Sequence, residues 1–542
     1  MESENKGELI FANDDLLKDD LSFTSSGGIK KIIFLSIGII FVFLLLVLLL
    51  VLLSKNDNKI IPKPDPEKNE TFIYQNITLK YKIDYENKTI KIVNFSNEDI
   101  SYIKSMKINN ESFNYTNNIT FNSTGIFIIE IILNKSISTM KDLFKDNMNL
   151  TEVNLTELYT ENVKSMSGTF SNCIKLSNIN LSNFNTENVE DMSYMFSNCK
   201  SLENIDLSNF NTTNLNNMQN MFSGCETLEK LNISSFNTKK VTKMSYLFSQ
   251  CRALKNLNIS NFSTQNVIYM DYMFSGCNNL ASIDLLYFDT ENVTRMESMF
   301  KDCNSLTSLN LYKFNTKNVL YMSEMFEYCT SLKYLNISNF DTQNVTEMIS
   351  MFEDCEELVS INISNFNTVK VKKMQKMFKD CSSLASLDLS DFNNDNLVNM
   401  EYMFSGCESL KFLNLSNFKT NNVENMGYLF RDCSSLENLN LSTFNTKNVN
   451  NMDGMFSNCE KIASLDLSNF NTEMVTNTMS MFKNCHSLKN LNLSNFNTLH
   501  LKSYDSMFKR LADRGTIIIN KAIFNISLPV YIERGWKVIQ NE

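Results

Sequence analysis

The sequence contains very few of the residues on which catalysis and metal binding usually depend. Its 542 residues include only 2 histidines, His486 and His500. Each replaces an ordinary residue of a repeat, so both are expected to be surface substitutions. No histidine and cysteine pair has zinc-ligand spacing, no glycine-rich loop suits a phosphate, and no nucleophile has a base nearby in the sequence. We therefore expect a protein that is not an enzyme and that holds no metal or cofactor.

An excess of positive charge is also lacking. The chain has 50 Lys and Arg against 60 Asp and Glu, which gives a formal net charge of −10. A surface of this sign repels phosphate backbones and anionic lipid headgroups. We therefore expect no nucleic-acid partner.

One repeated unit makes up most of the sequence. All 13 cysteines recur at a fixed interval of 26 residues, from Cys173 to Cys485. With the cysteine as position 0, apolar residues fall at positions 3, 6 and 8, and phenylalanine at position 11. The alternation at positions 6 and 8 predicts a short strand, and apolar residues at positions 16, 19, 22 and 23 predict one face of a short helix. Threonine at position 13, replaced only by Asn394 among these units, is placed to cap that helix.

This unit predicts an α/β solenoid of about fifteen strand-turn-helix coils, each of which buries its apolar face against its neighbours. Degenerate units extend the array at both ends, so the predicted solenoid spans residues 141–520. The cysteines lie one strand spacing apart, which is compatible with disulfides. Their number is odd, however, and buried cysteine also serves as a small apolar filler. We predict mostly free, buried thiols, with disulfides as the alternative.

The string LxxLNLSNFNTxNVxxMxxMFxxC resembles the repeat of BspA-like leucine-rich-repeat surface proteins, which is also known from Mycoplasma lipoproteins. The resemblance covers roughly Phe144 to Asn520, and departures at core positions are minor, such as Leu247 and Leu429 in place of methionine. It implies a leucine-rich-repeat-type solenoid that is displayed at the cell surface and used for adhesion or recognition. It implies no catalytic residues.

The N-terminal part of the chain predicts a membrane anchor. Residues 1–31 are polar and predict a short cytoplasmic tail. Residues 32–53 carry no charge and are long enough to cross a bilayer as one helix. We interpret them as an uncleaved transmembrane signal anchor, because the apolar run is too long for a cleaved signal peptide and no cleavage site follows it. Residues 54–70 hold three of the chain's 4 prolines among charged residues, and predict a stalk.

The orientation of this anchor is inferred from the rest of the chain. Lysines flank both ends of the apolar run, so charge barely indicates a direction. Asn-x-Ser/Thr sequons recur throughout the C-terminal part and are absent from residues 1–54. We expect a single-pass type II protein with its large C-terminal region extracellular, and candidate N-glycosylation sites at Asn76, Asn87, Asn94, Asn110, Asn118 and Asn134.

Two further segments flank the repeats. Residues 71–140 contain short β-branched and aromatic runs between Asn-rich turns, and predict a small β-rich domain, most simply a sandwich. This domain would cap the open N-terminal edge of the solenoid, or alternatively act as a separate binding module. Residues 521–542 predict a C-terminal cap, with the only tryptophan, Trp536, in a hydrophobic lid.

Some exposed repeat positions depart from the consensus near the middle of the array. Positions 9 and 10 are usually Ser-Asn, but are Leu286-Tyr287 and Tyr312-Lys313 in two consecutive units, and Tyr334 follows at position 5 of the next. Exposed apolar and aromatic patches often mark contact sites, although neutral drift would leave the same pattern. The candidate partner-binding patch is therefore Leu286, Tyr287, Tyr312, Lys313 and Tyr334.

These features predict a non-catalytic, membrane-anchored cell-surface recognition or adhesion protein whose solenoid binds an extracellular protein or glycan. The alternative is a structural surface-coat component whose repeats associate with copies of themselves. A localised aromatic patch favours recognition, whereas uniform exposed positions would favour assembly.

Overall fold

The computed structural model describes residues 74–526, 528 and 535–541. The chain divides into two units, Met1–Thr71 and Phe72–Glu542, and all described residues belong to the second. The expected tail (1–31), transmembrane anchor (32–53) and stalk (54–70) lie outside the described residues. Within the part that is described, no helix is both long and apolar enough to cross a membrane.

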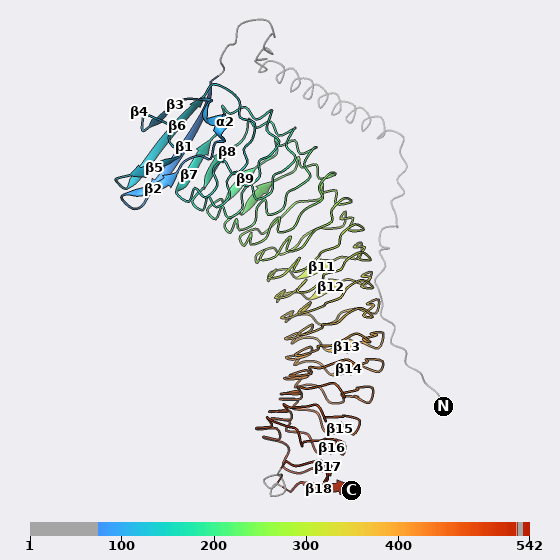
Figure 1. Cartoon of the computed structure of the whole chain (residues 1–542). Coiled ribbons are helices and arrows are strands. Elements are labelled where there is room, and N and C mark those ends of the chain that lie inside the picture. Colours follow the sequence, from blue (N-terminus) through green and yellow to red (C-terminus); the bar gives the residue numbers. More distant parts are fainter. Residues whose placement is uncertain (1–73, 527, 529–534, 542) are drawn as a thin grey trace, which may run out of the picture. The chain divides into compact units, whose positions relative to one another are not determined.

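The described chain begins with a β-rich segment that continues into the repeats (Figure 1). β1 (Gln75–Ile83) pairs antiparallel with β6 (Gly125–Leu133) on one side and with β7 (Leu150–Asn154), the strand of the first coil, on the other. The strand order is β4-β3-β6-β1-β7-β8, in which β3 is Ile103–Ile108, β4 is Glu111–Phe113 and β8 is Asn178–Asn180. β1 therefore covers the edge that the first coil would otherwise expose.

A two-stranded sheet of β2 (Lys88–Lys91) and β5 (Asn118–Phe121) and the single helical turn α2 (Asn97–Ile100) complete this segment. Alternate side chains of β1 are buried, as its period-two apolar pattern requires. Tyr81 of β1 is fully buried, which raises the pKa of its phenol. Its hydroxyl lies 3.1 Å from Oδ1 of Asn147, at position 0 of the first coil, and so ties this segment to the repeats.

Each coil that follows adds one short segment to a parallel strand face, and the assigned strands are only three to five residues long. In these strands the apolar residue at position 6 faces its counterpart in the next coil, as Ile205 faces Leu231. The strands are β9 (Asn204–Asp206), β10 (Lys230–Asn232), β11 (Ser308–Asn310), β12 (Tyr334–Asn336), β13 (Ser386–Asp388), β14 (Phe412–Asn414), β15 (Ser464–Asp466), β16 (Asn490–Leu493), β17 (Thr516–Asn520) and β18 (Lys537–Asn541).

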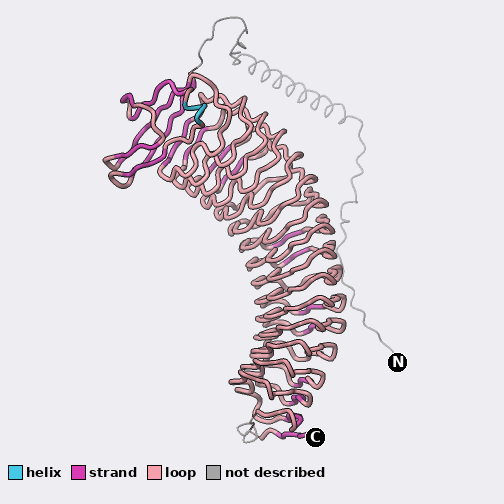
Figure 2. The backbone as a smooth tube through the Cα atoms, in the orientation of Figure 1, coloured by secondary structure: helices cyan, strands magenta, loops and turns pink. Residues whose placement is uncertain are grey.

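On the other side of the coils, isolated parallel bridges link position 18 of one coil to position 18 of the next, from Ser165 to Ser503. The fold is therefore a β-solenoid of about 14 turns. Among the described residues α2 is the only α-helix (Figure 2).

The predicted helix in each coil, and with it the α/β class, is wrong. Positions 19–25 form a chain of tight turns, in which Tyr194 and Asn198 have left-handed backbone (φ 58°). Alternate backbone N–H groups leave the coil: Tyr194 N–H donates to Gln219 O (2.9 Å) and Phe196 N–H to Met221 O (2.9 Å), both in the next coil. An α-helix needs those donors for its own i−4 carbonyls. The apolar spacing was correctly interpreted as one buried face, but stacked neighbours, rather than the coil itself, satisfy the backbone.

The threonine at position 13 consequently caps no helix. The Thr316 hydroxyl donates to Asp341 O (2.9 Å) and accepts a hydrogen bond from Asp341 N–H (2.8 Å). Asp341 is at position 12 of the next coil. The same pair of bonds recurs at Thr264 and Thr290. The residue predicted to start an element instead clamps one coil to the next.

The core is a set of ladders that run along the stack. Phenylalanines at position 23 stack continuously from Phe144 to Phe508 with ring centroids 5.3–6.1 Å apart, and burying each side chain stabilises the fold by roughly 1.5–3 kcal/mol. All 13 cysteines are buried and free, as predicted. Each thiol donates to the carbonyl of the phenylalanine 29 residues earlier in the sequence, as Cys199 does to Phe170 O (3.2 Å).

The C-terminal end is closed by β18, which pairs in parallel with β17. Trp536 is buried, and its indole Nε1–H donates to Ala512 O (2.8 Å). The only tryptophan thus packs on the last coil, where a hydrophobic lid was expected.

Candidate interaction surface

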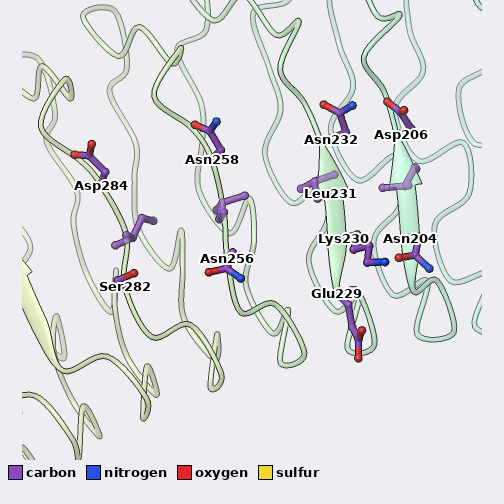
Figure 3. Close-up of a pocket in the computed structure, with 13 residues that line it drawn as sticks. Asn204, Asp206, Glu229, Lys230, Leu231, Asn232, Asn256, Asn258, Ser282 and Asp284 are labelled. Atoms are coloured by element: carbon purple, nitrogen blue, oxygen red, sulfur yellow. The ribbon is translucent and has the colours of Figure 1, made fainter.

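The strand face of the solenoid presents two rows of side chains to solvent. In the short strands, position 6 points into the core and positions 5 and 7 point outward, as in β9, where Asn204 and Asp206 are exposed and Ile205 is buried. Figure 3 shows these two rows across four adjacent coils. We call this surface, made of positions 5 and 7 of every coil, the strand face.

Position 7 is held in place by its own backbone. The side-chain oxygen of each Asn or Asp accepts the backbone N–H two residues later, as Asp206 accepts Ser208 N–H (2.9 Å) and Asp388 accepts Ser390 N–H (2.9 Å). This Asx turn explains why the repeat uses Asn or Asp here. Hydrogen bonds from Ser208 and Asn232 hold the pKa of Asp206 below its usual range.

A shallow groove of about 790 Å³ lies on the strand face near the N-terminal end of the array. Its lining includes charged residues of both signs, Glu229 and Lys230, and the two carboxylates Asp206 and Asp284, at position 7 of its outermost coils. None of its lining residues is aromatic. Sequence reasoning did not single out this groove, because its residues follow the consensus.

A second groove of about 410 Å³ lies on the same face over β11, β12 and the next coil. Tyr334 lines this groove, and its side chain is largely exposed to solvent (73%). Its floor contains Leu309, Leu335 and Ile361, and its polar lining is mainly serine and asparagine. One predicted patch residue therefore lies in a groove.

The other four patch residues lie outside this groove. Leu286 and Tyr287 are exposed (44% and 66%), whereas Tyr312 is only half-exposed. The Lys313 ammonium lies 5.0 Å from the Tyr312 ring. These four belong to the turn that follows the strand, so the structure separates Tyr334 from them. We call Leu286, Tyr287, Tyr312 and Lys313 the turn row.

Two other exposed aromatic features were missed by sequence reasoning. Phe412, in β14 and at position 5 of its coil, is 57% exposed. It could have been found by looking for aromatic residues at position 5, as Tyr334 was. On the bridge side of the coils, Tyr269, Arg295 and Tyr321 are consecutive bridge residues, and the Arg295 guanidinium lies 5.0 Å from the Tyr321 ring. The sequence signal for this second cluster is weak, because position 18 varies throughout the array.

A charge ladder, with two buried glutamates between two half-buried lysines, occupies position 24 of four consecutive coils, where the flanking coils have Ser275 and Ser405. Its members are Lys301, Glu327, Glu353 and Lys379. Lys301 Nζ lies 2.6 Å from Glu327 Oε2, and Lys379 Nζ lies 3.1 Å from Glu353 Oε1. Burial raises the pKa of Glu327 to about 7, with Glu324 and Glu353 adding to the rise and Lys301 opposing it.

The candidate glycosylation sites fall into two groups. Asn87, Asn110 and Asn118 are exposed. Asn76, Asn94 and Asn134 are partly buried, and their amide oxygens are buried without a partner. The Nδ2 of Asn94, the atom that a glycan would replace, donates to Asp142 O (2.7 Å).

Among the described residues, no group of three or more His, Cys, Asp or Glu side chains is arranged to hold a metal ion. The cysteines are buried and burial raises the pKa of Cys225 to about 12, so this thiol stays protonated and unreactive.

Comparison with curated proteins finds no match. Three solved structures are similar to this chain, with low TM-scores and low sequence identity. The functional domain of InlJ from Listeria monocytogenes, described as including a cysteine ladder, is 13% identical over 69% of each chain, with a TM-score of 0.20. The Toll–Spatzle complex from Drosophila is 14% identical over 68% of this chain and 55% of that one (TM-score 0.16). TLR13 in complex with ssRNA13 is 15% identical over 71% and 80% (TM-score 0.14). With TM-scores this low, no functional conclusion follows.

One protein-family model matches the chain four times, over residues 118–230, 216–334, 307–413 and 399–518. The matches together cover the repeats and more than half of the 542 residues. The chain therefore belongs to the family described as Mycoplasma protein of unknown function, DUF285.

Proposed function

We propose that this chain is a non-catalytic recognition or adhesion protein of the cell surface, which binds an extracellular protein or glycan through its solenoid. The observation that supports this most directly is the strand face: a long, exposed array of polar side chains interrupted by the exposed rings of Tyr334 and Phe412. Aromatic residues contribute a large share of binding energy at interfaces. The turn row, with Leu286 and Tyr287 exposed, extends the proposed contact surface.

The membrane anchor and the BspA-like, leucine-rich-repeat character are parts of this proposal. The uncharged run of residues 32–53 supports one transmembrane helix, and the sequons beyond it support an extracellular C-terminal region. The repeat string supports kinship with BspA-like surface proteins within the broader family.

A self-associating coat is the second candidate function. The observation in its favour is that position 7 is Asn or Asp in every cysteine-bearing coil, and that position 9 is Ser in all of them except at Leu286 and Tyr312. A uniform surface of this kind offers equivalent contacts to neighbouring copies.

Two measurements on the full chain, carrying a C-terminal epitope tag, test the proposal. Protease added to intact cells should remove the tag, and cells displaying the chain should adhere to coatings of matrix proteins or glycoproteins better than cells lacking it. The double variant Tyr287→Ala, Tyr312→Ala tests the turn row, and should weaken adhesion where a protein partner is bound there. A tag protected until cells are permeabilised contradicts the proposal, and concentration-dependent self-association without adhesion supports the coat.

A further inference from the structure

Two aromatic rings on the strand face lie in the same row of side chains. Tyr334 and Phe412 both occupy position 5, and are 73% and 57% exposed. Tyr334 is paired with Ser308 across β11 and β12, and Phe412 with Ser386 across β13 and β14. The coil of Ser360 lies between these pairs, so the rings are three strand spacings apart, about 14 Å.

The row between the two rings consists of small hydroxyl groups. Ser360 and Ser386 occupy position 5 in the two intervening coils. Within the described residues, neither hydroxyl has a hydrogen-bond partner in the protein. Beside them, Asn362 and Asp388 form the position 7 row, with one side-chain oxygen each used in an Asx turn. The segment from Tyr334 to Phe412, which we call the aromatic slot, thus offers unused donors and acceptors between two apolar rings.

Charge is nearly balanced along the aromatic slot. At its edge, Lys333 is paired with Glu357 (Nζ to Oε2 2.9 Å). At positions 4–7 of these four coils, the remaining charged groups are Asp388 and Lys411, which are of opposite sign. The groove nearer the N-terminus differs, because its lining includes three carboxylates, one lysine and no aromatic ring. The aromatic slot is therefore chemically distinct from that groove.

We propose that the aromatic slot binds an uncharged, linear oligosaccharide that lies along the stack, across the strands. This inference rests on the proposed function and specifies its ligand. Between its rings the slot repeats a serine at position 5, and position 7 is asparagine in three of the four coils and Asp388 in the other. This regular spacing matches a polymer of repeated units better than an aperiodic protein surface. The rings of Tyr334 and Phe412 stack on the apolar C–H faces of sugar rings, while serine hydroxyls and asparagine amides bond to sugar hydroxyls.

The test uses the full chain in detergent, captured through a C-terminal tag. The probes are neutral β-1,4-linked oligosaccharides of glucose, N-acetylglucosamine, xylose and mannose, in increasing length, with a uronic-acid series for comparison. We expect at least one neutral series to bind, with affinity rising until the ligand spans both rings and then levelling off. Tyr334→Ala and Phe412→Ala should each weaken binding about tenfold, the loss typical of a removed aromatic contact.

Tyr85→Ala is the matched control, because Tyr85 is as exposed as Tyr334 (73%) but lies between β1 and β2, outside the aromatic slot and the turn row. It should leave saccharide binding unchanged. The proposal is overturned by a chain that binds no neutral saccharide, by one that prefers the uronic-acid series, or by binding that neither slot variant weakens. If saccharides fail but displayed cells still adhere to protein coatings, the ligand class is wrong and the proposed function stands. If adhesion also fails, the proposed function falls with it.

Discussion

At the scale of single residues, the coil depends on backbone conformations that most side chains avoid. Positions 21 and 25 are left-handed in nearly every coil, including at Tyr428 (φ 58°) and Asp432 (φ 61°). Left-handed backbone costs a residue with a Cβ roughly 1–2 kcal/mol, and Gly and Asn tolerate it best. The coil accepts this cost because the conformation directs alternate N–H groups to the next coil.

Gly406, at position 25, allows this cost to be measured. Its φ is +75°, and a Cβ there would overlap the Asp380 carboxylate. We expect Gly406→Ala to lower the free energy of unfolding by about 1–2 kcal/mol, seen as a lower thermal midpoint by circular dichroism. Gly406→Asn is the control, because Asn198, Asn458 and Asn484 occupy the same position with φ near 60°. Equal midpoints for the Ala and Asn variants would contradict this account.

The charge ladder predicts a pH dependence of stability. The pKa of Glu327 is raised from 4.5 to about 7, mainly by burial. A folded pKa above the unfolded value means that the stabilising contribution of the protonated group is complete below pH 4.5 and is lost as pH rises through 7. Glu327→Gln cannot ionise, so its thermal midpoint should fall less than that of the wild type between pH 5 and 7.5.

Other groups limit how flat the profile of this variant becomes. The pKa of Asp354 is raised to about 6, again mainly by burial, and its contribution has the same sign. The variant should therefore be less pH-dependent, not independent of pH. Glu357→Gln, which removes an exposed glutamate paired with Lys333, serves as the control. Parallel profiles for the wild type and Glu327→Gln would show that Glu327 carries no such dependence.

At the scale of the element, the sequence predicted which side chains are buried better than it predicted backbone conformation. Positions 3, 8, 11, 16, 19 and 23 are inside, as their apolar character required. The helix was wrong because the 3.6-residue spacing of Leu215, Met218 and Phe222 also suits a chain of turns whose N–H groups bond to a neighbouring coil. Apolar periodicity predicts which face is buried. It does not distinguish an α-helix from a chain of turns, because these two conformations differ in the partners of their backbone N–H groups.

Position 13 supplies a stability test of the clamp between coils. Asn394 replaces the usual threonine, is fully buried, and has neither amide atom paired. A buried polar group without a partner costs roughly 1–3 kcal/mol. Asn394→Thr should restore the clamp and raise the thermal midpoint, by an amount equivalent to about 1 kcal/mol. Thr316→Val, which removes both bonds to Asp341, should lower it. A thermal midpoint that rises in Asn394→Thr and falls in Thr316→Val would support the clamp between coils. An unchanged midpoint in Asn394→Thr would argue against it.

At the scale of the whole molecule, the described chain is one stack with both ends covered. β1 pairs with the first coil and β18 with the last strand of the array. The fixed cysteine interval predicted the stack and the free thiols. The composition of the β-rich segment did not predict that β1 would join the solenoid sheet directly, because pairing between distant strands leaves no local sequence signal. Tyr334 was predicted within one patch, but it lies in strand β12, whereas the turn row lies in the turn that follows the strand.

Glycan occupancy tests the proposed extracellular placement on the chain as a whole. Only sequons that are exposed on the outer side of a membrane can be modified, and the β-rich segment offers both kinds of site. Asn87, Asn110 and Asn118 are exposed, whereas Asn94 donates its amide to Asp142 O (2.7 Å). In a eukaryotic secretory pathway, we expect Asn110→Gln to remove one glycosidase-sensitive mass step and Asn94→Gln to remove none. A wild-type chain whose mass glycosidase leaves unchanged would place this segment on the cytoplasmic side. Loss of a step in Asn94→Gln alone would mean that modification precedes the packing of that side chain.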